Sequence, residues 1–233
     1  MAEVIMILGE SGAGKSASLR NFQPGEVCIL NVAGKRLPFK NQLGQSVVNL
    51  MNTSIAARYG NINCIIHSGK YPCYVIDDSQ YLMAFEAFDR AMETGYGKFT
   101  EMAKHFYDLI VGCKQANTIW ERDPKSKTWQ DTGKPLPETN IYFLHHLEKD
   151  DSGFIKPKTQ GKMIDEKLNL AGMFSIVLLA GTDGNEYWFQ TKSDGSSVVK
   201  APMGMFAEER IPNDLAMVDK IIRDYYCDET GGN

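Results

Sequence analysis

Hydrophobic residues gather in short unbroken runs along the chain, and glycine, proline or polar residues bound each run. Five runs have the length and composition of strands that are buried on both faces of a parallel sheet. They lie at residues 4–8, 27–32, 71–76, 140–147 and 173–180. A sixth run at 186–191 follows a Thr-Asp-Gly-Asn turn, which predicts an antiparallel strand. Residues 63–67 predict a further short strand.

Between these runs, hydrophobic residues recur at the three- and four-residue spacing of helices. One stripe comprises Tyr81, Phe85, Phe88 and Met92, and another extends from Phe99 to Cys113. We expect both stripes to pack in the core. A weaker pattern at 42–59 predicts irregular helix. Residues 213–227 predict a C-terminal helix with Asn213 or Asp214 as its cap.

Strands that alternate with helices indicate an α/β protein. We predict one domain over residues 1–233, with a mostly parallel sheet flanked by helices and an antiparallel strand near the C-terminus. Residues 117–140 interrupt the pattern with two tryptophans, several cations, Gly133 and Pro135. We expect a β-hairpin insertion there, which is either a surface excursion or a contact site for nucleic acid or a partner.

Composition narrows the classes of protein that fit this chain. Its 233 residues carry a formal net charge of −4, so any contact with nucleic acid needs a local basic patch. The run at 173–180 is too short to cross a membrane, and the first strand begins too early for a signal peptide. Five cysteines without a C-x-x-C pair indicate reduced thiols in a cytoplasmic protein.

The first strand runs into the sequence Gly-Glu-Ser-Gly-Ala-Gly-Lys-Ser, which matches the phosphate-binding P-loop pattern G-x-x-x-x-G-K-[ST]. A strand before the match and a helix-forming segment after it are the context in which this pattern binds nucleotides. Glycines let backbone amides close around a triphosphate. Lys15 would reach the β- and γ-phosphates, and the Ser16 hydroxyl would ligate Mg²⁺. The predicted nucleotide contacts are Gly9, Glu10, Ser11, Gly12, Ala13, Gly14, Lys15, Ser16 and Ala17.

Asp77 and Asp78 directly follow the run at 71–76, which is the pattern of a Walker B strand. A strand that ends at Asp77 places this carboxylate beside the P-loop, where it would hold Mg²⁺ through the water shell of the ion. Asp78 is placed to act as a general base on the attacking water. The alternative for the acid pair is a strand end with a helix cap.

The run at 140–147 ends near two histidines, His145 and His146. P-loop ATPases with a strand between the Walker A and Walker B strands usually end that strand in a polar residue that senses the γ-phosphate. We expect one histidine to take this role and the other to pack against a neighbour. Neither has cysteine or histidine companions at zinc-ligand spacing, so a zinc site is not predicted.

The segment after these histidines, residues 148–168, is polar and rich in lysine. Its lysines stand out in a chain of net negative charge, although several acidic residues dilute them. One hypothesis is a solvated, flexible loop, and the other is contact with a nucleic-acid backbone. The candidates for phosphate contact are Lys149, Lys156, Lys158 and Lys162.

These motifs together resemble the bacteriophage-encoded P-loop ATPases of the RecA/AAA type, in particular the core-only RecA-like ATPases linked to single-strand annealing and recombination. The resemblance covers nearly the whole chain. It is carried by GESGAGKS at 9–16, NVAGKRLP at 31–38, YVIDD at 74–78, the strand that ends in His145-His146, and KAPMGMF with IPNDL at 200–215.

The resemblance implies a RecA-like core that binds ATP and Mg²⁺, hydrolyses ATP and acts on single-stranded DNA in recombination. It also implies a homo-oligomer, a phage annealing or single-strand-binding protein as partner, no membrane association and a place in the host cytoplasm. By position, the lysine-rich segment corresponds to the second DNA-binding loop of RecA-like proteins. Their sites are often completed by a basic residue of the neighbouring subunit. The candidates are Lys200, Arg210, Lys35 and Arg36, of which we favour Lys200 because it precedes a rigid proline turn.

Two other classes of protein remain open. A P-loop kinase for small molecules would need a lid with catalytic arginines, for which Arg122 alone is a poor candidate. A nucleotide-switched interaction protein without DNA binding would fit the lack of an evident catalytic glutamate. DNA-stimulated ATP turnover, compared with phosphate transfer to a nucleoside monophosphate, separates the three classes.

Overall fold

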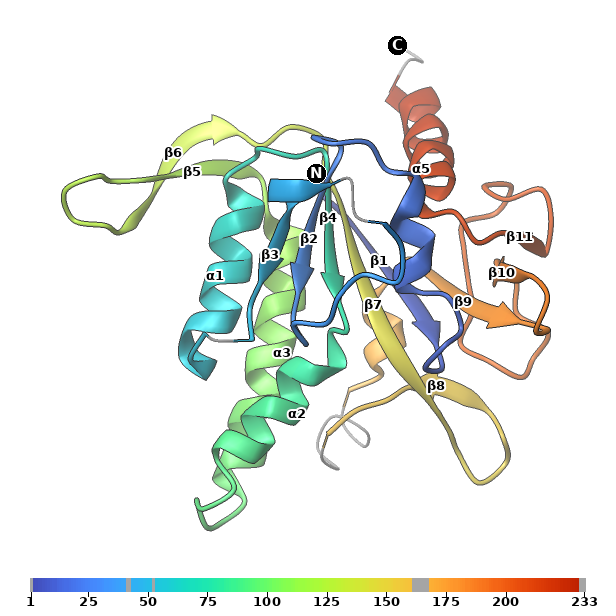
Figure 1. Cartoon of the computed structure of the whole chain (residues 1–233), viewed down its shortest axis with the longest axis horizontal. Coiled ribbons are helices and arrows are strands. Elements are labelled where there is room, and N and C mark those ends of the chain that lie inside the picture. Colours follow the sequence, from blue (N-terminus) through green and yellow to red (C-terminus); the bar gives the residue numbers. More distant parts are fainter. Residues whose placement is uncertain (1, 41–42, 52, 161–167, 231–233) are drawn as a thin grey trace.

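The computed structural model describes residues 2–40, 43–51, 53–160 and 168–230, and within them nine strands form one mixed sheet (Figure 1). These strands are β1 (Glu3–Gly9), β2 (Val27–Asn31), β3 (Val47–Asn49), β4 (Cys73–Asp77), β7 (Asn140–Lys149), β8 (Ile155–Pro157), β9 (Ile176–Thr182), β10 (Tyr187–Gln190) and β11 (Arg210–Pro212). Their order is β11-β10-β9-β1-β7-β4-β2-β3, with β8 paired to β7. The strands from β9 to β3 in this order run parallel, whereas β10 is antiparallel to both of its neighbours, β9 and β11, and β8 is antiparallel to β7. The predicted α/β class and mostly parallel sheet are confirmed.

The carboxyl ends of the central strands meet at one edge of the sheet, which is the lower edge in Figure 1. β7 lies between β1 and β4, and its register places His146 opposite Gly9. Asn31 at the end of β2 lies opposite Asp77 at the end of β4. The strand ends that the sequence marks as chemically active are therefore neighbours in space.

Helices cover both faces of this sheet. Those on one face are α1 (Ile55–His67), α2 (Gln80–Asp89) and α3 (Gly97–Gln115), and those on the other are the six-residue 3₁₀ helix η1 (Ser16–Asn21) and α5 (Leu215–Thr230). Successive side chains of β1 alternate between the two cores: Met6 packs with Phe106 of α3, whereas Ile7 belongs to the cluster that holds Leu215. Two further 3₁₀ turns are η2 (Gly44–Ser46) and η3 (Leu170–Met173).

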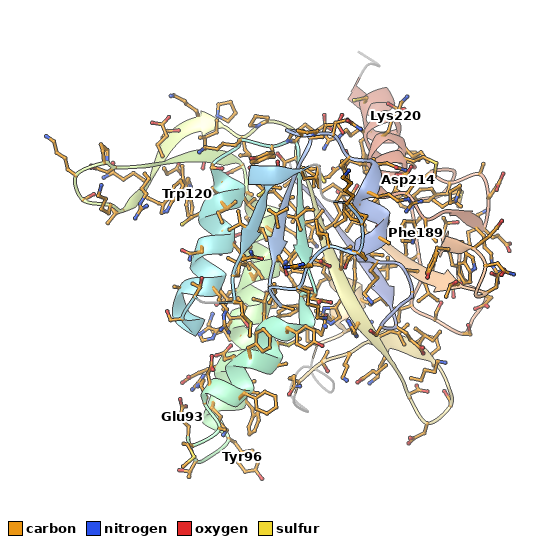
Figure 2. The ribbon with its side chains drawn as sticks, viewed as in Figure 1. Glu93, Tyr96, Trp120, Phe189, Asp214 and Lys220 are labelled. Atoms are coloured by element: carbon orange, nitrogen blue, oxygen red, sulfur yellow. The ribbon has the colours of Figure 1, made fainter. Side chains whose placement is uncertain are left out.

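Residues 117–140 contain a separate two-stranded antiparallel sheet, formed by β5 (Thr118–Arg122) and β6 (Trp129–Pro135). Figure 1 shows this hairpin projecting from the body beside α1. The ring of Trp120, labelled in Figure 2, stacks on His67 of α1 with 3.9 Å between ring centroids. Nδ1 of His67 also lies 2.8 Å from the carbonyl oxygen of Thr118. These contacts hold the base of the hairpin against α1.

Three predictions of local structure are wrong. Residues 63–67 belong to α1, in which Ile62 and Ile66 lie one turn apart and both pack in the core. Residues 42–59 include η2 and β3 as well as the start of α1. The lysine-rich segment is not simply an open loop, because β7 continues to Lys149 and β8 pairs back onto it. Such short runs carry too little periodicity for strand and helix to be distinguished from sequence.

The two hydrophobic stripes that we expected in the core are only partly buried. Phe106 and Cys113 of α3 are fully buried, whereas Phe88 and Met92 are 78% and 94% exposed. The turn between α2 and α3 extends beyond the sheet, and Figure 2 shows Tyr96 at its tip. The first stripe continues beyond the edge of the sheet towards this turn, so its last residues stay exposed.

The C-terminal helix begins as the sequence predicts. Oδ1 of Asp214 accepts hydrogen bonds from the backbone amides of Ala216 at 3.1 Å and Met217 at 3.3 Å, so Asp214 is the residue that caps α5. None of the helices in the described part of the chain is long and apolar enough to cross a membrane.

Candidate nucleotide-binding site

The P-loop connects β1 to η1 in a conformation that requires two of its glycines. Gly12 and Gly14 have φ values of 84° and 87°, in the left-handed region that residues with a Cβ rarely adopt. A Cβ atom on Gly14 would also lie only 2.7 Å from Cδ1 of Tyr187. The backbone therefore explains Gly14, which the motif prescribes, and Gly12, which stands at a position where the motif allows any residue.

The Lys15 side chain folds back onto the start of this loop. Its Nζ donates hydrogen bonds to the carbonyl oxygens of Gly9 at 2.6 Å and Glu10 at 2.9 Å, and the residue is only 6% exposed. Burial lowers the pKa of Lys15 to about 8, although Asp78 and Asp77 act in the opposite direction. The amine is still mostly protonated at neutral pH. It therefore places a poorly solvated positive charge beside the loop.

Ser16 and Asp77 meet directly although 61 positions separate them in the chain. The Ser16 hydroxyl donates a hydrogen bond to Oδ1 of Asp77 at 2.8 Å. Asp77 is 5% exposed, and burial together with the charge of Asp78 raises its pKa to about 6. The two predicted magnesium ligands are therefore adjacent, and the carboxylate lacks much of the solvation that would stabilise its charge.

Asp78 differs from Asp77 in its backbone and in its partners. Its φ of 61° is unusual for a residue other than glycine, although aspartate tolerates this region better than most. Lys35 Nζ lies 2.7 Å from Oδ2, and His146 Nε2 lies 3.4 Å from Oδ1. Burial opposes ionisation, but the hydrogen bonds of His146 and Lys35 outweigh it and lower the pKa of Asp78 to about 2. Asp78 is thus a fixed anion and, in this arrangement, a weak base.

The two histidines have different surroundings. His145 is fully buried, with Nδ1 2.8 Å from the Ser79 hydroxyl oxygen and Nε2 2.7 Å from the carbonyl oxygen of Lys158. A carbonyl can only accept, so Nε2 carries the hydrogen. Burial lowers the pKa of His145 to about 4, which keeps the ring neutral at physiological pH. Of the two candidate sensors, the structure brings only His146 to the site.

These groups surround one pocket of about 460 Å³ at the carboxyl edge of the sheet. Its lining comprises Glu10, Ser11, Gly12, Gly14, Lys15, Ser16, Ala17, Lys35, Arg36, Pro38, Asp77, Asp78, His146 and Tyr187. Gly9 and Ala13 belong to the same loop but do not line the pocket. Lys35 and Arg36 reach it from the loop after β2, where the parallel sheet predicts that ligand-binding loops gather.

Sequence reasoning missed Tyr187 and Pro38 in the lining of this pocket. Tyr187 opens an antiparallel strand after a turn, and no motif marks it as a site residue. The sequence does predict that the strand at 186–191 follows a buried strand of the same sheet. It does not predict that this buried strand, β9, lies beside β1, and only that neighbourhood brings Tyr187 to the P-loop.

Lys200 lies outside the pocket. It lines a second cavity of about 730 Å³ together with residues of 191–193 and 201–207. Its backbone pairs with Val177 near the start of β9, away from the end where the P-loop begins. Burial, with the charge of Lys114, lowers the pKa of Lys200. A role for Lys200 in the site of a neighbouring subunit stays a prediction.

The candidate DNA-binding lysines lie on the β7–β8 hairpin and next to it, and acidic residues contact two of them. Lys149 Nζ lies 3.6 Å from Glu10 Oε1 of the P-loop, and Lys156 Nζ lies 3.1 Å from Glu148 Oε1. Lys158 is exposed, and its backbone amide donates to the carbonyl oxygen of His146 at 2.9 Å. Lys162 lies outside the described residues.

The pocket can hold an anion against Lys15 and the P-loop amides, with a cation beside Ser16 and Asp77. Among the described residues, no group of three or more histidine, cysteine or acidic side chains could hold a metal ion by itself. A scan of the chain against protein-family models finds no matching family, and a search among curated proteins finds no match.

Proposed function

We propose that this chain binds a nucleoside triphosphate, ATP, with Mg²⁺ in the P-loop pocket and hydrolyses it. The observation that carries the proposal is the meeting of Lys15, Ser16 and Asp77 beside a loop whose glycines adopt left-handed conformations. Lys15 and Ser16 follow β1, Asp77 ends β4, and each has the chemistry that triphosphate and metal binding require.

The residues present fit Mg²⁺ bound together with a nucleotide. Magnesium prefers oxygen ligands, keeps several waters and takes substrate phosphates as further ligands. The Ser16 hydroxyl and the Asp77 carboxylate would supply the oxygen ligands that come from the protein. When bound, the ion would neutralise charge on the phosphate oxygens. No group of three or more histidine, cysteine or acidic side chains in the described residues could hold a metal ion by itself, which suits a metal that arrives with its phosphates.

The remaining charged groups of the pocket have distinct roles in this proposal. Lys15 binds phosphate oxygens and replaces its present carbonyl partners. His146 lies on β7 opposite Gly9, the last residue of β1, where it would contact the terminal phosphate or the attacking water. Asp78 orients that water, or the side chains of Lys35 and His146 around it, through hydrogen bonds. Its low pKa favours this orienting role over proton removal, unless a ligand draws Lys35 away.

The order of the sheet supports a RecA-like core as part of the proposal. β7, which carries His146, lies between the P-loop strand β1 and the strand β4 that ends in Asp77. This order is the one expected of P-loop ATPases with a strand inserted between Walker A and Walker B. A switch protein that binds nucleotide without turning it over is the second candidate, and the low pKa of Asp78 favours it.

Single-stranded DNA is the proposed macromolecular partner, with a homo-oligomer and an annealing or single-strand-binding protein as further parts of the proposal. The proposal is supported by the position of Lys149, Lys156 and Lys158, which follow the pocket residue His146 closely in the chain. The ion pairs of Lys149 and Lys156 reduce the charge that is available to a phosphate backbone.

The test is a turnover assay with Mg-ATP in the presence and absence of single-stranded DNA, beside an assay for phosphate transfer to nucleoside monophosphates. We expect phosphate release that DNA stimulates and no transfer. Binding without release would favour the switch protein, and transfer to a monophosphate would establish a kinase. Phosphate release that Lys15→Ala leaves unchanged would come from another site or a contaminant.

A further inference from the structure

The pocket has two chemically different ends on either side of the P-loop strand. Asp77 and Asp78 come from β4 and His146 from β7, which lie on one side of β1. Tyr187 comes from β10, which follows β9 on the other side. One end of the pocket is therefore acidic and suited to a metal, and the other carries an aromatic ring.

Tyr187 packs directly on the P-loop. A Cβ atom on Gly14 would lie 2.7 Å from Cδ1 and 3.2 Å from Cγ of this ring, so the ring lies against the backbone one residue before Lys15. Half of Tyr187 is nevertheless exposed. Among the described residues that line the pocket, it is the single phenyl-type ring, and the structure pairs it with no other aromatic ring.

The strand beneath the ring is held firmly. The neighbouring Trp188 packs over Gly181, where a Cβ atom would lie 2.2 Å from the indole, and the Arg210 guanidinium lies 4.2 Å from its ring centroid. The carbonyl oxygen of Tyr187 accepts a hydrogen bond from the Asn213 amide at 3.3 Å. Tyr187 is thus a half-exposed ring that contacts the P-loop from a firmly held strand, as a stacking platform requires.

We propose that Tyr187 forms the nucleobase subsite of the pocket, on whose exposed part the base of a nucleoside triphosphate stacks. This inference rests on the proposed nucleotide binding. The metal-bearing phosphates belong beside Ser16 and Asp77, so the nucleoside must leave the P-loop at the opposite end, where Tyr187 lies. Stacking accepts every base through its π-face, so ATP and GTP should bind with similar affinity.

The experiment compares two ligands that share a triphosphate chain, Mg-ATP and Mg-tripolyphosphate, by calorimetric titration. The variants are Tyr187→Ala, Tyr187→Phe and the control Tyr107→Ala. Tyr107 is 42% exposed on α3 and does not line the pocket. We expect Tyr187→Ala to weaken Mg-ATP binding by about 5- to 150-fold, the range for one base–aromatic stack, and to leave tripolyphosphate affinity unchanged. Tyr187→Phe and Tyr107→Ala should behave as the wild type.

Two results overturn the inference while the nucleotide proposal survives. One is a Tyr187→Ala protein that binds Mg-ATP as tightly as the wild type. The other is an equal loss of affinity for Mg-ATP and Mg-tripolyphosphate, which would mean that the ring supports the P-loop rather than the base. A wild-type protein that binds neither ligand overturns the proposed function as well, so the two failures are distinguishable.

Discussion

The P-loop pocket and the β7–β8 hairpin both carry many charged residues, but they arrange them differently. In the pocket, Lys15 and Asp77 are almost fully buried and face a common space. On the hairpin, the side chain of Lys149 is 57% exposed and that of Lys156 is 35% exposed, and each contacts a glutamate. Buried charged groups that face a common space without a partner of opposite charge for each indicate a ligand site. Exposed charged groups that pair with one another are weaker evidence for such a site.

The difference shows what a count of charges omits. The lysine-rich segment stands out in the sequence, yet its acidic neighbours Glu148 and Glu10 become contacts of Lys156 and Lys149 in the fold. Exposed pairs of this kind contribute little to stability and compete weakly with a strong anion. Lys149 and Lys156 can therefore bind DNA only if phosphates displace their glutamate partners, whereas Lys15 needs to exchange only its two carbonyl partners.

The largest effect is expected at Lys15. Lys15→Ala removes the buried cation of the pocket, and we expect Mg-ATP affinity to fall by about 2–5 kcal/mol, the usual cost of removing one partner of a buried charge pair. Calorimetric titration measures it, with Lys104→Ala as control because Lys104 is an exposed lysine on α3 paired with Asp108. If both variants bind ATP alike, the pocket is not the nucleotide site.

The next effect concerns His145, which is buried behind the pocket and contacts Ser79 and the carbonyl oxygen of Lys158. Its folded pKa of about 4 lies below the ordinary value of 6.5, so the unfolded chain binds more protons between these pH values. Stability from His145 is complete above pH 6.5 and falls as the pH drops towards 4, by at most about 3 kcal/mol.

Urea unfolding at several pH values, for the wild type and His145→Gln, measures this contribution. Glutamine does not titrate, so the difference in unfolding free energy between the two proteins should shrink as the pH falls from 6.5 to 4. A difference that stays constant over this range would contradict the assignment of a neutral, buried His145.

The two acids of the pocket should separate in kinetics. Asp78→Asn should leave Mg-ATP affinity largely intact and lower turnover by roughly 100-fold, whether the carboxylate orients water or removes a proton. Asparagine tolerates the left-handed backbone of residue 78, so the fold should be preserved. Asp77→Asn should instead weaken Mg²⁺-dependent binding. If both variants bind equally and only Asp77→Asn is slow, Asp78 is a structural residue.

The smallest effect is expected on the hairpin, in a salt titration of single-stranded DNA binding. Each lysine that neutralises a phosphate contributes about 0.7 to the log–log slope, so replacing Lys156 and Lys158 by alanine should lower the slope by about 1.4 if both contact DNA. A decrease near 0.7 would mean that one lysine contributes. Glu148→Gln should strengthen binding, because it releases Lys156 from its carboxylate partner. Wild-type protein that binds no DNA at low salt would remove this part of the proposal.

The sequence predicts those parts of the site that local motifs determine. The P-loop and the Asp77 strand end follow from short patterns, and parallel strands bring their carboxyl ends to one edge. The contact of Tyr187 with Gly14 and the pairing of Lys149 with Glu10 join residues that lie more than 100 positions apart. Which of His145 and His146 faces the pocket depends on strand register, because one residue reverses the side-chain direction.

The exposed turn between α2 and α3 shows the same limit in the fold. Helical spacing gives Phe88 the pattern of a core residue, but burial depends on where the sheet ends. The three-residue strands β3 and β8 form because longer neighbours offer them partners, which their own sequences do not reveal.

The most direct test of Mg-ATP binding in the P-loop pocket is a calorimetric titration of the wild-type protein with ATP, once with Mg²⁺ and once with EDTA. We expect one site per chain whose affinity depends strongly on Mg²⁺, and loss of this dependence in Asp77→Asn. Absence of ATP binding at any Mg²⁺ concentration would contradict the central claim. Equal affinity with Mg²⁺ and EDTA would contradict the assignment of Ser16 and Asp77 to the metal.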